Sequence, residues 1–347
     1  MVREEIDGTR TDIVTLSSFI LQEQRRYNSK YHDQGSSIIR EASGELSLLL
    51  NSLQFAFKFI ANNIRKAELV NLIGLSGVIN STGDEQKQLD SICNDIFIQA
   101  MKTNGCIRVI VSEEEEKEIL VDSSGSYAIT CDPIDGSSNI DAGVSVGTIF
   151  GIYKIHPGSN GSLKDVLRSG NEMVAAGYTM YGASAHLLLT TGHKVNGFTL
   201  DSNLGEFILT HRNLSMPHFK NIYSINEGNT LYWPPKIADF IHSLKVAPEG
   251  GKPYAARYIG SMVADVHRTM LYGGLFCYPC SRGKGKLRLL YECFPMAFLC
   301  EQANGLAVND KGERILDLTP EHIHEQSSIW LGSKGEIQKY VDYINKH

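Results

Sequence analysis

Apolar residues recur at helical spacing in several stretches of the chain, and each stripe predicts a helix with one buried face. The strongest stripe follows Ser43 and Gly44, where the serine can cap a helix. Thr82 and Glu85 form a capping-box pattern ahead of another stripe. The pattern predicts helices over 12–27, 46–64, 82–100, 237–244, 261–272 and 295–303.

Shorter runs rich in branched and aromatic residues predict strands. The run 144–153 is almost wholly apolar, so we expect it to be buried on both faces. The glycine-interrupted segment Leu69–Gly83 predicts a loop that can order or release. Strands are expected at 107–111, 127–131, 144–153, 173–181, 186–190, 197–200, 207–210, 222–225 and 287–291.

Helices and strands together predict a layered α/β protein with two mixed-sheet subdomains flanked by helices. The polar stretch His211–Pro217 is the best candidate for a boundary. We therefore expect an N-terminal domain over residues 1–214 and a C-terminal domain over residues 215–347.

Composition narrows the class of protein. The net charge of −6 and the lack of a long basic block argue against a nucleic-acid binder. No run approaches the ~18 apolar residues of a membrane span, and the first residues lack a signal core. Seven cysteines fit reduced thiols in a cytoplasmic setting. Cys277 and Cys280 have the spacing of a redox pair or half of a zinc site, although packing is the favoured interpretation.

The most informative segment is Asp132-Pro-Ile-Asp-Gly-Ser-Ser-Asn139, which follows a predicted buried strand. Its two aspartates can hold hard divalent cations through oxygen. The proline restricts its own backbone and that of the preceding residue, so both carboxylates are aimed by the chain. Gly136 allows close approach to a ligand, and the amides that follow can cradle a phosphate. The eight residues together predict phosphate and metal chemistry rather than an ordinary turn.

Further charged residues suit that chemistry, because phosphoryl transfer needs metals and cations around the transferring group. Carboxylates stand at the ends of predicted elements at Asp84, Asp90, Glu113, Glu114, Asp132, Asp135 and Glu292. Cations without an intervening acid stand at Arg282, Lys284, Lys286 and Arg288. Taken singly, most of these charges are also explained as solvated surface residues.

The motif resembles that of the Mg²⁺-dependent, lithium-sensitive sugar and inositol phosphatases, and the wider chain resembles class I fructose-1,6-bisphosphatases. The resemblance runs from about Leu46 to nearly the C-terminus. It includes the segments 44–46, 111–114, 145–153, 225–228, 257–268 and 285–292. It implies the αβαβα sugar-phosphatase fold, and hydrolysis of fructose 1,6-bisphosphate to fructose 6-phosphate and phosphate by metal-activated water, as in gluconeogenesis.

The resemblance also implies roles for individual residues. Two to three Mg²⁺ or Mn²⁺ ions per subunit would be held by Glu113, Asp132, the carbonyl of Ile134, Asp135 and Glu292, with Asp84 near a further ion. Asp90 and Glu114 would activate the attacking water. The substrate would be bound by Gly136, Ser137, Ser138, Asn226, Arg257, Tyr258, Met262, Tyr278, Lys286 and Arg288. Arg257 would reach into a neighbouring subunit's site, which implies a homotetramer, and closure of the Leu69–Gly83 loop would complete the metal site.

The family's inhibitory AMP site implies a helix start as a phosphate cradle. Here it would comprise Ser43, Gly44, Glu45, Ser47, Tyr127 and Lys154. Three positions depart from the family pattern. Ser126 replaces a lysine and Lys154 an arginine in the AMP site, and Asn229 replaces a tyrosine near the substrate.

Alternatives stay open at this point. A sedoheptulose-bisphosphatase or inositol phosphatase would use the same chemistry, although the cations around Lys286 and Arg257 favour a substrate with two phosphates. A catalytically silent sugar-phosphate or AMP sensor and a zinc scaffold on Cys277 and Cys280 belong to other classes. A peroxisome-type location is the alternative to the cytoplasm if the natural chain extends past His347.

Overall fold

The computed structural model describes residues 13–32, 44–67, 75–79, 85–246 and 251–346. Its largest sheet has eight strands in the order β10-β9-β8-β7-β6-β5-β3-β4. Only β3 and β5 are parallel neighbours in this sheet. The strands are β3 (Ile107–Ser112), β4 (Ile119–Leu120), β5 (Tyr127–Asp135), β6 (Val146–Lys154), β7 (Met173–Tyr181), β8 (Ala185–Thr190), β9 (Val195–Asp201) and β10 (Glu206–Leu214).

A second mixed sheet has five strands in the order β12-β11-β13-β17-β15. They are β11 (Ile222–Ser224), β12 (Ala255–Ala256), β13 (Leu275–Tyr278), β15 (Gly305–Val308) and β17 (Ile329–Ser333). Two antiparallel pairs lie outside these sheets: β1 (Leu75–Ile79) with β2 (Glu85–Lys87), and β14 (Leu287–Arg288) with β16 (Gln326–Ser327).

Seven α-helices complete the described part of the chain. They are α1 (Leu16–His32), α2 (Glu45–Lys66), α3 (Gln88–Lys102), α4 (Pro235–Lys245), α5 (Met262–Tyr272), α6 (Phe294–Gln302) and α7 (Lys334–Lys346). No described helix combines the length and the apolar character that a membrane crossing requires.

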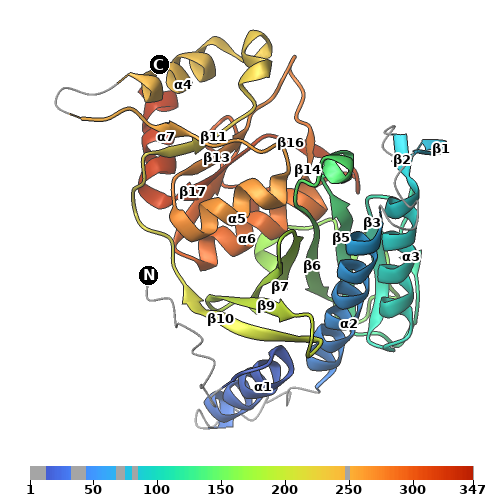
Figure 1. Ribbon diagram of the computed structural model, residues 1–347. Coiled ribbons are helices and arrows are strands. Elements are labelled where there is room, and N and C mark those ends of the chain that lie inside the picture. The colour runs from blue at the N-terminus through green and yellow to red at the C-terminus, as the bar shows by residue number, and fades with distance from the viewer. Residues whose placement is uncertain (1–12, 33–43, 68–74, 80–84, 247–250, 347) are drawn as a thin grey trace.

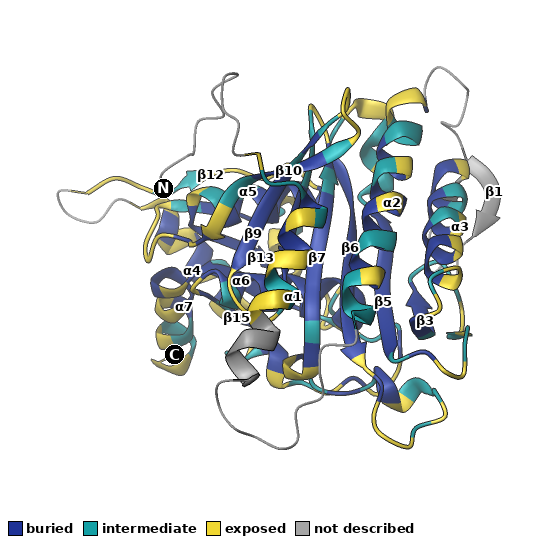
Figure 2. Ribbon diagram, turned by 90° about the horizontal axis from the view of Figure 1, so that it is seen from below, coloured by how far each residue is buried: buried dark blue, intermediate teal, exposed yellow. Residues whose placement is uncertain are grey.

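The alternation of side chains along the strands produces five layers. On β5, Ile129 packs with α1–α3, whereas its neighbour Ala128 faces the core that contains α5 and α6. On β17, Leu331 faces that same central core, whereas Trp330 packs with α4 and α7 on the far side. The order is therefore helices, eight-stranded sheet, helices, five-stranded sheet, helices (Figure 1). Strands of the large sheet are buried along most of their length, and the helices expose their outer faces (Figure 2).

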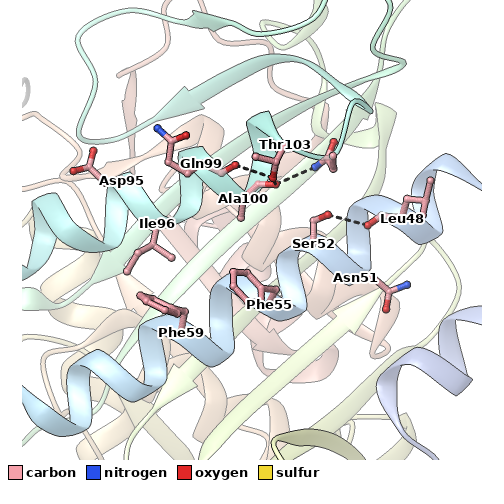
Figure 3. Close-up of a pocket in the computed structure, with 11 residues that line it drawn as sticks. Leu48, Asn51, Ser52, Phe55, Phe59, Asp95, Ile96, Gln99, Ala100 and Thr103 are labelled. Carbon is pink, nitrogen blue, oxygen red and sulfur yellow. Dashed lines mark hydrogen bonds between the residues drawn. The ribbon is translucent and has the colours of Figure 1, made fainter.

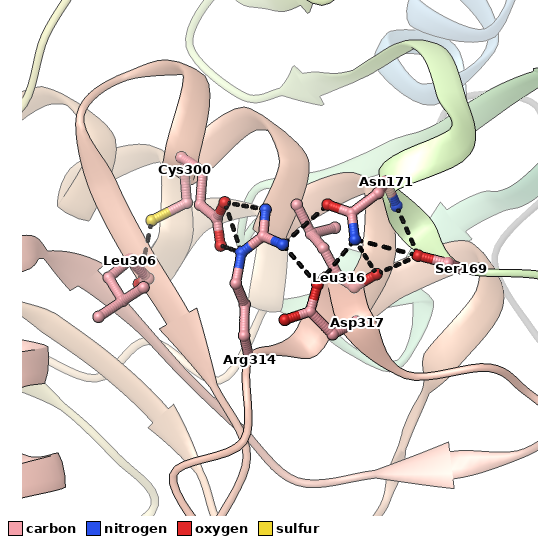
Figure 4. A network of polar contacts seen from close by, with 8 residues as sticks. Ser169, Asn171, Cys300, Leu306, Arg314, Leu316 and Asp317 are labelled. Atoms are coloured by element: carbon pink, nitrogen blue, oxygen red, sulfur yellow. Dashed lines mark hydrogen bonds and ion pairs between the residues drawn. The ribbon is translucent and has the colours of Figure 1, made fainter.

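Polar contacts also join segments that are distant in the sequence. Arg314 donates from Nη1 to Asn171 Oδ1 at 2.8 Å and binds Glu301 and Asp317 (Figure 4). Ser169 donates to the carbonyl of Leu316 at 2.7 Å. The segment before β7 is thereby fixed to the chain between β15 and β16.

Most predicted elements are present, including β7 with the expected bounds, and β6 is buried from Val146 to Tyr153 as expected. Two N-terminal expectations are wrong. The cap of α2 is Gly44, which has a left-handed backbone and makes no side-chain cap, while Ser43 lies outside the described residues. Glu85 lies in β2 rather than in a capping box, because α3 begins only at Gln88.

Three further expectations need correction. Within the predicted 69–83 loop, residues 75–79 form β1, and the remaining residues lie outside the described part. The predicted 287–291 strand ends at Arg288, after which Leu289–Cys293 form a π-helical turn. The start of the polar 211–217 stretch still belongs to β10, which pairs with β9 as far as Leu214.

Candidate active site

A β-bulge near the end of β5 brings the two motif carboxylates together. In a regular strand, residues three apart point to opposite faces. Here Asp132 lies opposite Ile149, whereas Asp135 lies opposite Gly147, so β5 carries one extra residue. A bulge tolerates the missing amide of Pro133 and re-aims the flanking side chains. The first half of the motif, Asp132–Asp135, therefore lies within the strand end, and Gly136–Asn139 lead into the 3₁₀ turn that follows.

Hydrogen bonds hold the bulge in place. Ile134 donates its amide to Asp132 Oδ1 at 3.0 Å, and Thr148 of β6 donates to the carbonyl of Pro133 at 2.8 Å. Gly136 follows with a φ of 79°, a left-handed conformation that favours glycine. A Cβ at this position would also lie 3.1 Å from Ser261 Oγ.

The third carboxylate comes from the other end of the chain. Glu292 lies in the π-helical turn after β14, and π turns occur frequently at functional sites. The amide of Arg288 donates to Glu292 Oε2 at 2.5 Å and turns the carboxylate back toward β5. Oxygens of Asp132, Asp135 and Glu292 all lie within 4.8 Å of one another. This cluster is a candidate metal centre.

The three carboxylates are largely buried and lie close to one another, so burial and mutual repulsion both disfavour their ionised forms. Burial raises the pKa of Asp132 well above its usual range, and the charges of Glu113, Asp135 and Glu292 raise it further. Burial also raises the pKa of Asp135 to about 6, although the amide of Val263 and the charge of Lys286 oppose this shift. Burial raises the pKa of Glu292, and the charges of Glu113 and Asp135 raise it further. A divalent cation would relieve this repulsion.

The acidic run after β3 lies beside the cluster. The amide of Glu113 donates to the carbonyl of Cys131 at 3.0 Å, directly before Asp132. Asp90 at the start of α3 is buried. Burial raises the pKa of the Cys93 thiol, and the carboxylates of Asp90 and Glu114 raise it further. Asp90 and Glu114, the two residues predicted to activate water, therefore both lie near Cys93. Asp84 lies outside the described residues.

Cations and tyrosines also lie near the carboxylates. Arg288 is buried, and its Nη1 donates to the carbonyl of Lys286 at 2.9 Å. Its buried Nε finds no hydrogen-bond partner among the described residues. Lys286 Nζ lies 6.0 Å from the centre of the Tyr278 ring, and its charge reaches Asp135. Burial raises the pKa of Tyr258, with further contributions from the neighbouring Tyr278 and from Asp135.

The remaining predicted substrate residues lie in loops and at helix starts. Ser137 and the exposed Ser138 begin a 3₁₀ turn. Asn226 caps another 3₁₀ turn by accepting the amide of Gly228 at 3.1 Å. Met262 is buried at the first position of α5, and the exposed Arg257 donates to its neighbouring carbonyl, that of Ala256.

The predicted nucleotide residues meet at the start of α2 and one end of β5. Tyr127 and Lys154 are direct partners in the β5–β6 ladder. Glu45 in the first turn of α2 contributes to the raised pKa of Cys106, whose carbonyl accepts the amide of Tyr127 at 3.1 Å. Ser47 donates to Gln24 Oε1 of α1 at 2.8 Å. These contacts place Tyr127 beside Lys154, and Glu45 near the residue whose carbonyl bonds to Tyr127.

One residue that joins the acidic run to the turn of Glu292 could not be predicted from the sequence pattern. His324 accepts or donates through Nδ1 at 2.8 Å from the hydroxyl of Tyr291. Its Nε2 lies 3.1 Å from the carbonyl of Glu115, which can only accept. Neutral His324 therefore donates from Nε2 and accepts at Nδ1, joining the acidic run to the turn of Glu292.

A pocket of about 740 Å³ lies elsewhere, between α2 and α3. Phe55, Phe59 and Ile96 point into it from the two helices (Figure 3). None of the residues predicted for catalysis, metal or substrate lines this pocket. The predicted site therefore lies outside this apolar pocket.

Comparisons with known proteins agree with this fold. The family model described as fructose-1-6-bisphosphatase, N-terminal domain, matches residues 14–212, and that of the C-terminal domain matches residues 216–345. Fructose-1,6-bisphosphatase of Schizosaccharomyces pombe is 74% identical over 346 residues, covering 99% of this chain and 100% of that protein. The Saccharomyces cerevisiae protein of the same name is 60% identical over 349 residues, covering 99% and 97%. The crystal structure of Leishmania major fructose-1,6-bisphosphatase in holo form superposes with a TM-score of 0.87 at 40% identity, covering 96% and 99%. The chain therefore belongs to the class I fructose-1,6-bisphosphatase family of phosphoric monoester hydrolases.

Proposed function

We propose that this protein hydrolyses the 1-phosphate of fructose 1,6-bisphosphate, which yields fructose 6-phosphate and phosphate and serves gluconeogenesis. The observation that carries the proposal is the convergence of Asp132, Asp135 and Glu292 within 4.8 Å, with Arg288 and Lys286 beside them. Carboxylates suit metals, and cations suit phosphate oxygens. The family membership supports the choice of substrate.

The donor set fits Mg²⁺, or alternatively Mn²⁺, because it consists of closely spaced carboxylates whose charges raise one another's pKa. Two to three ions would be held by Asp132, Asp135, Glu292, Glu113 and the carbonyl of Ile134. Asp84 would lie near a further ion. When bound, the ions would neutralise charge on the transferring phosphoryl group and lower the pKa of water.

Different side chains of the protein would bind the two phosphates at the two ends of the substrate. Arg288 would hold the 1-phosphate together with the amides after Gly136. Lys286, Tyr258, Tyr278 and Asn226 would hold the 6-phosphate and the sugar. Asp90 and Glu114 would accept the proton of the attacking water.

We also propose that AMP inhibits the enzyme by binding where α2 begins. The start of a helix attracts phosphate, and Gly44, Glu45 and Ser47 lie there. Tyr127 and Lys154, paired across β5 and β6, would complete the site. Ser126 replaces the family's lysine and removes one positive charge beside the nucleotide, whereas Lys154 replaces the family's arginine and keeps its charge.

The assembly would be a homotetramer in which the exposed Arg257 enters a neighbouring subunit's site. We further propose domains over residues 1–214 and 215–347, each centred on one of the two large sheets. The proposed location is the cytoplasm, as the word "cytosolic" in the name of a rice relative with 50% identity suggests.

Phosphate release from fructose 1,6-bisphosphate with Mg²⁺, with EDTA and with Mg²⁺ plus AMP tests the proposal. Turnover that requires the metal supports the reaction, and its loss on adding AMP supports the regulatory site. A folded protein that binds the sugar phosphate but releases no phosphate with Mg²⁺ or Mn²⁺ would be a sensor instead. Faster release from sedoheptulose 1,7-bisphosphate or an inositol phosphate would reassign the substrate.

A further inference from the structure

Asp265, a fully buried residue of α5, holds a loop that carries predicted substrate residues. Its Oδ2 accepts the amides of Ile259 and Gly260, both at 3.0 Å. Its Oδ1 accepts the hydroxyl of Ser224 at 2.9 Å. A buried carboxylate with this many donors fixes the backbone around it, because each bond to a charged acceptor is stronger than a neutral one. The segment held in this way, Arg257–Gly260, is named here the tyrosine loop after Tyr258.

Arg268, one turn further along α5, strengthens the same attachment. Its Nη2 donates to Asp265 Oδ1 at 2.9 Å and to the carbonyl of Arg257 at 2.6 Å. The side chain of Arg268 is only 15% exposed, so this ion pair is shielded from water. Both ends of the tyrosine loop are therefore bonded to two side chains on neighbouring turns of one helix.

The same helix is bonded to the candidate metal centre. The amide of Val263, in the first turn of α5, donates to Asp135 Oδ2 at 2.9 Å. Asn139, at the end of the motif, donates from Nδ2 to the carbonyl of Gly260 at 3.2 Å. The first turn of α5 thus links Asp135 of the candidate metal centre to the tyrosine loop through a short, rigid connection.

We propose that Asp265 is a positioning residue that sets the distance between the carboxylate cluster and the tyrosine loop, and thereby the enzyme's preference for a substrate with two phosphates. This inference rests on the proposed function, in which Tyr258 binds the phosphate that is not hydrolysed. Asp265 touches neither substrate nor metal in this account. It acts by keeping Tyr258 at the distance that the second phosphate requires.

The test compares two substrates in the full-length enzyme with Mg²⁺. Fructose 1-phosphate keeps the reacting phosphate and lacks the second one. Asp265→Asn replaces one acceptor oxygen by a donor group, so either the loop amides or the Ser224 and Arg268 contacts are lost. We expect kcat/KM for fructose 1,6-bisphosphate to fall about tenfold, and that for fructose 1-phosphate to stay within about twofold.

Asp165→Asn is the matched control. Asp165 is also fully buried and accepts two backbone amides, of His156 and Ser162, and one serine hydroxyl. A general loss of structure lowers kcat/KM for both substrates equally, and we expect the ratio between them to be unchanged in this control. An unchanged ratio in Asp265→Asn would overturn the positioning role.

Two further variants keep the outcomes separate. Tyr258→Phe tests the proposed site itself, and an unchanged ratio there would refute the assignment of Tyr258 before Asp265 is considered. A lowered ratio in Tyr258→Phe together with an unchanged one in Asp265→Asn refutes the positioning role alone. Should Asp265→Asn not fold, Arg268→Gln removes the bond to the Arg257 carbonyl, and the same fall in the ratio is expected.

Discussion

Asp132 and Asp135 lie on a nine-residue strand with a partner strand on either side, whereas Tyr258 lies on an exposed loop of the C-terminal half. The ladder around β5 fixes the carboxylates through many backbone bonds and one bulge. The tyrosine loop depends on the side chains of Asp265 and Arg268. The two motif carboxylates are therefore held by the sheet, whereas Tyr258, which is predicted to select the substrate, is held by a few side chains.

A second loop repeats this arrangement. Tyr278 ends β13, and two residues later the amide of Cys280 donates to Asp310 Oδ2 at 2.8 Å. The indole of Trp330 donates to Asp310 Oδ1 at 2.7 Å. An aspartate thus anchors the chain beside each of the two tyrosines. Changes on the strand should abolish turnover, whereas changes on the loops should alter substrate binding.

The largest effect is expected from Asp132→Asn. Loss of one central carboxylate should lower kcat by about 10³-fold, because charge on the transferring phosphoryl group is no longer neutralised. The metal-free variant should melt no lower than the metal-free parent, since the substitution removes a charge whose ionisation burial and Glu113 oppose. Steady-state kinetics and a thermal melt in EDTA measure both. Wild-type turnover in this variant would remove Asp132 from the site.

Arg288→Met should have the next largest effect. The guanidinium is proposed to hold the phosphate that is cleaved, and its loss should lower kcat/KM by about 10²-fold. Because this phosphate is common to both substrates, fructose 1,6-bisphosphate and fructose 1-phosphate should be affected alike. An effect on the first substrate alone would place Arg288 at the second phosphate.

Lys286→Met should mainly raise KM for fructose 1,6-bisphosphate, by about tenfold, with kcat within about threefold. It should also move the acid limb of the pH profile. Lys286 lowers the pKa of Asp135, so its removal raises that pKa, and Asp135 becomes ionised only at higher pH. A pH–rate profile of the variant beside that of the parent shows the shift. An acid limb that moves to lower pH would contradict this geometry.

The smallest effect is on stability and depends on pH. In the metal-free protein the pKa of Asp135 is raised to about 6, so the folded state holds a proton that the unfolded chain loses near pH 4. Stability therefore falls as pH rises through this interval. Saturating Mg²⁺ should raise the melting temperature by about 5–10 °C at pH 7.5 and by less at pH 5. Equal shifts at both pH values would argue against binding to these carboxylates.

Sequence patterns predicted the strands of the fold better than the loops and turns that complete the candidate site. The bounds of β7 and the burial of β6 follow from local apolar runs, which a sequence displays directly. The bulge at Pro133 was not foreseen, because it depends on the register against β6. The Leu-Arg-Leu-Leu-Tyr run of 287–291 has the pattern of a strand, whereas the amide of Phe294 bonds to the carbonyl of Leu289 and closes a π turn.

The anchoring roles of Asp265 and Asp310 could not be predicted from the sequence for a different reason. Asp265 bonds to Ser224, which lies 41 residues earlier, and Asp310 bonds to Cys280, which lies 30 residues earlier. No periodicity links such partners. α7 and β17 were also missed. β17 is only five residues long, and its Gly332 has a φ of 148°.

The most direct test of the central claim is the identity of the product. Phosphorus NMR of fructose 1,6-bisphosphate incubated with the enzyme distinguishes loss of the 1-phosphate from loss of the 6-phosphate. The account predicts fructose 6-phosphate and inorganic phosphate with Mg²⁺, no change with EDTA, and formation of the same products about 10³-fold more slowly with Asp132→Asn. Fructose 1-phosphate as the product, or undiminished turnover by Asp132→Asn, would contradict it.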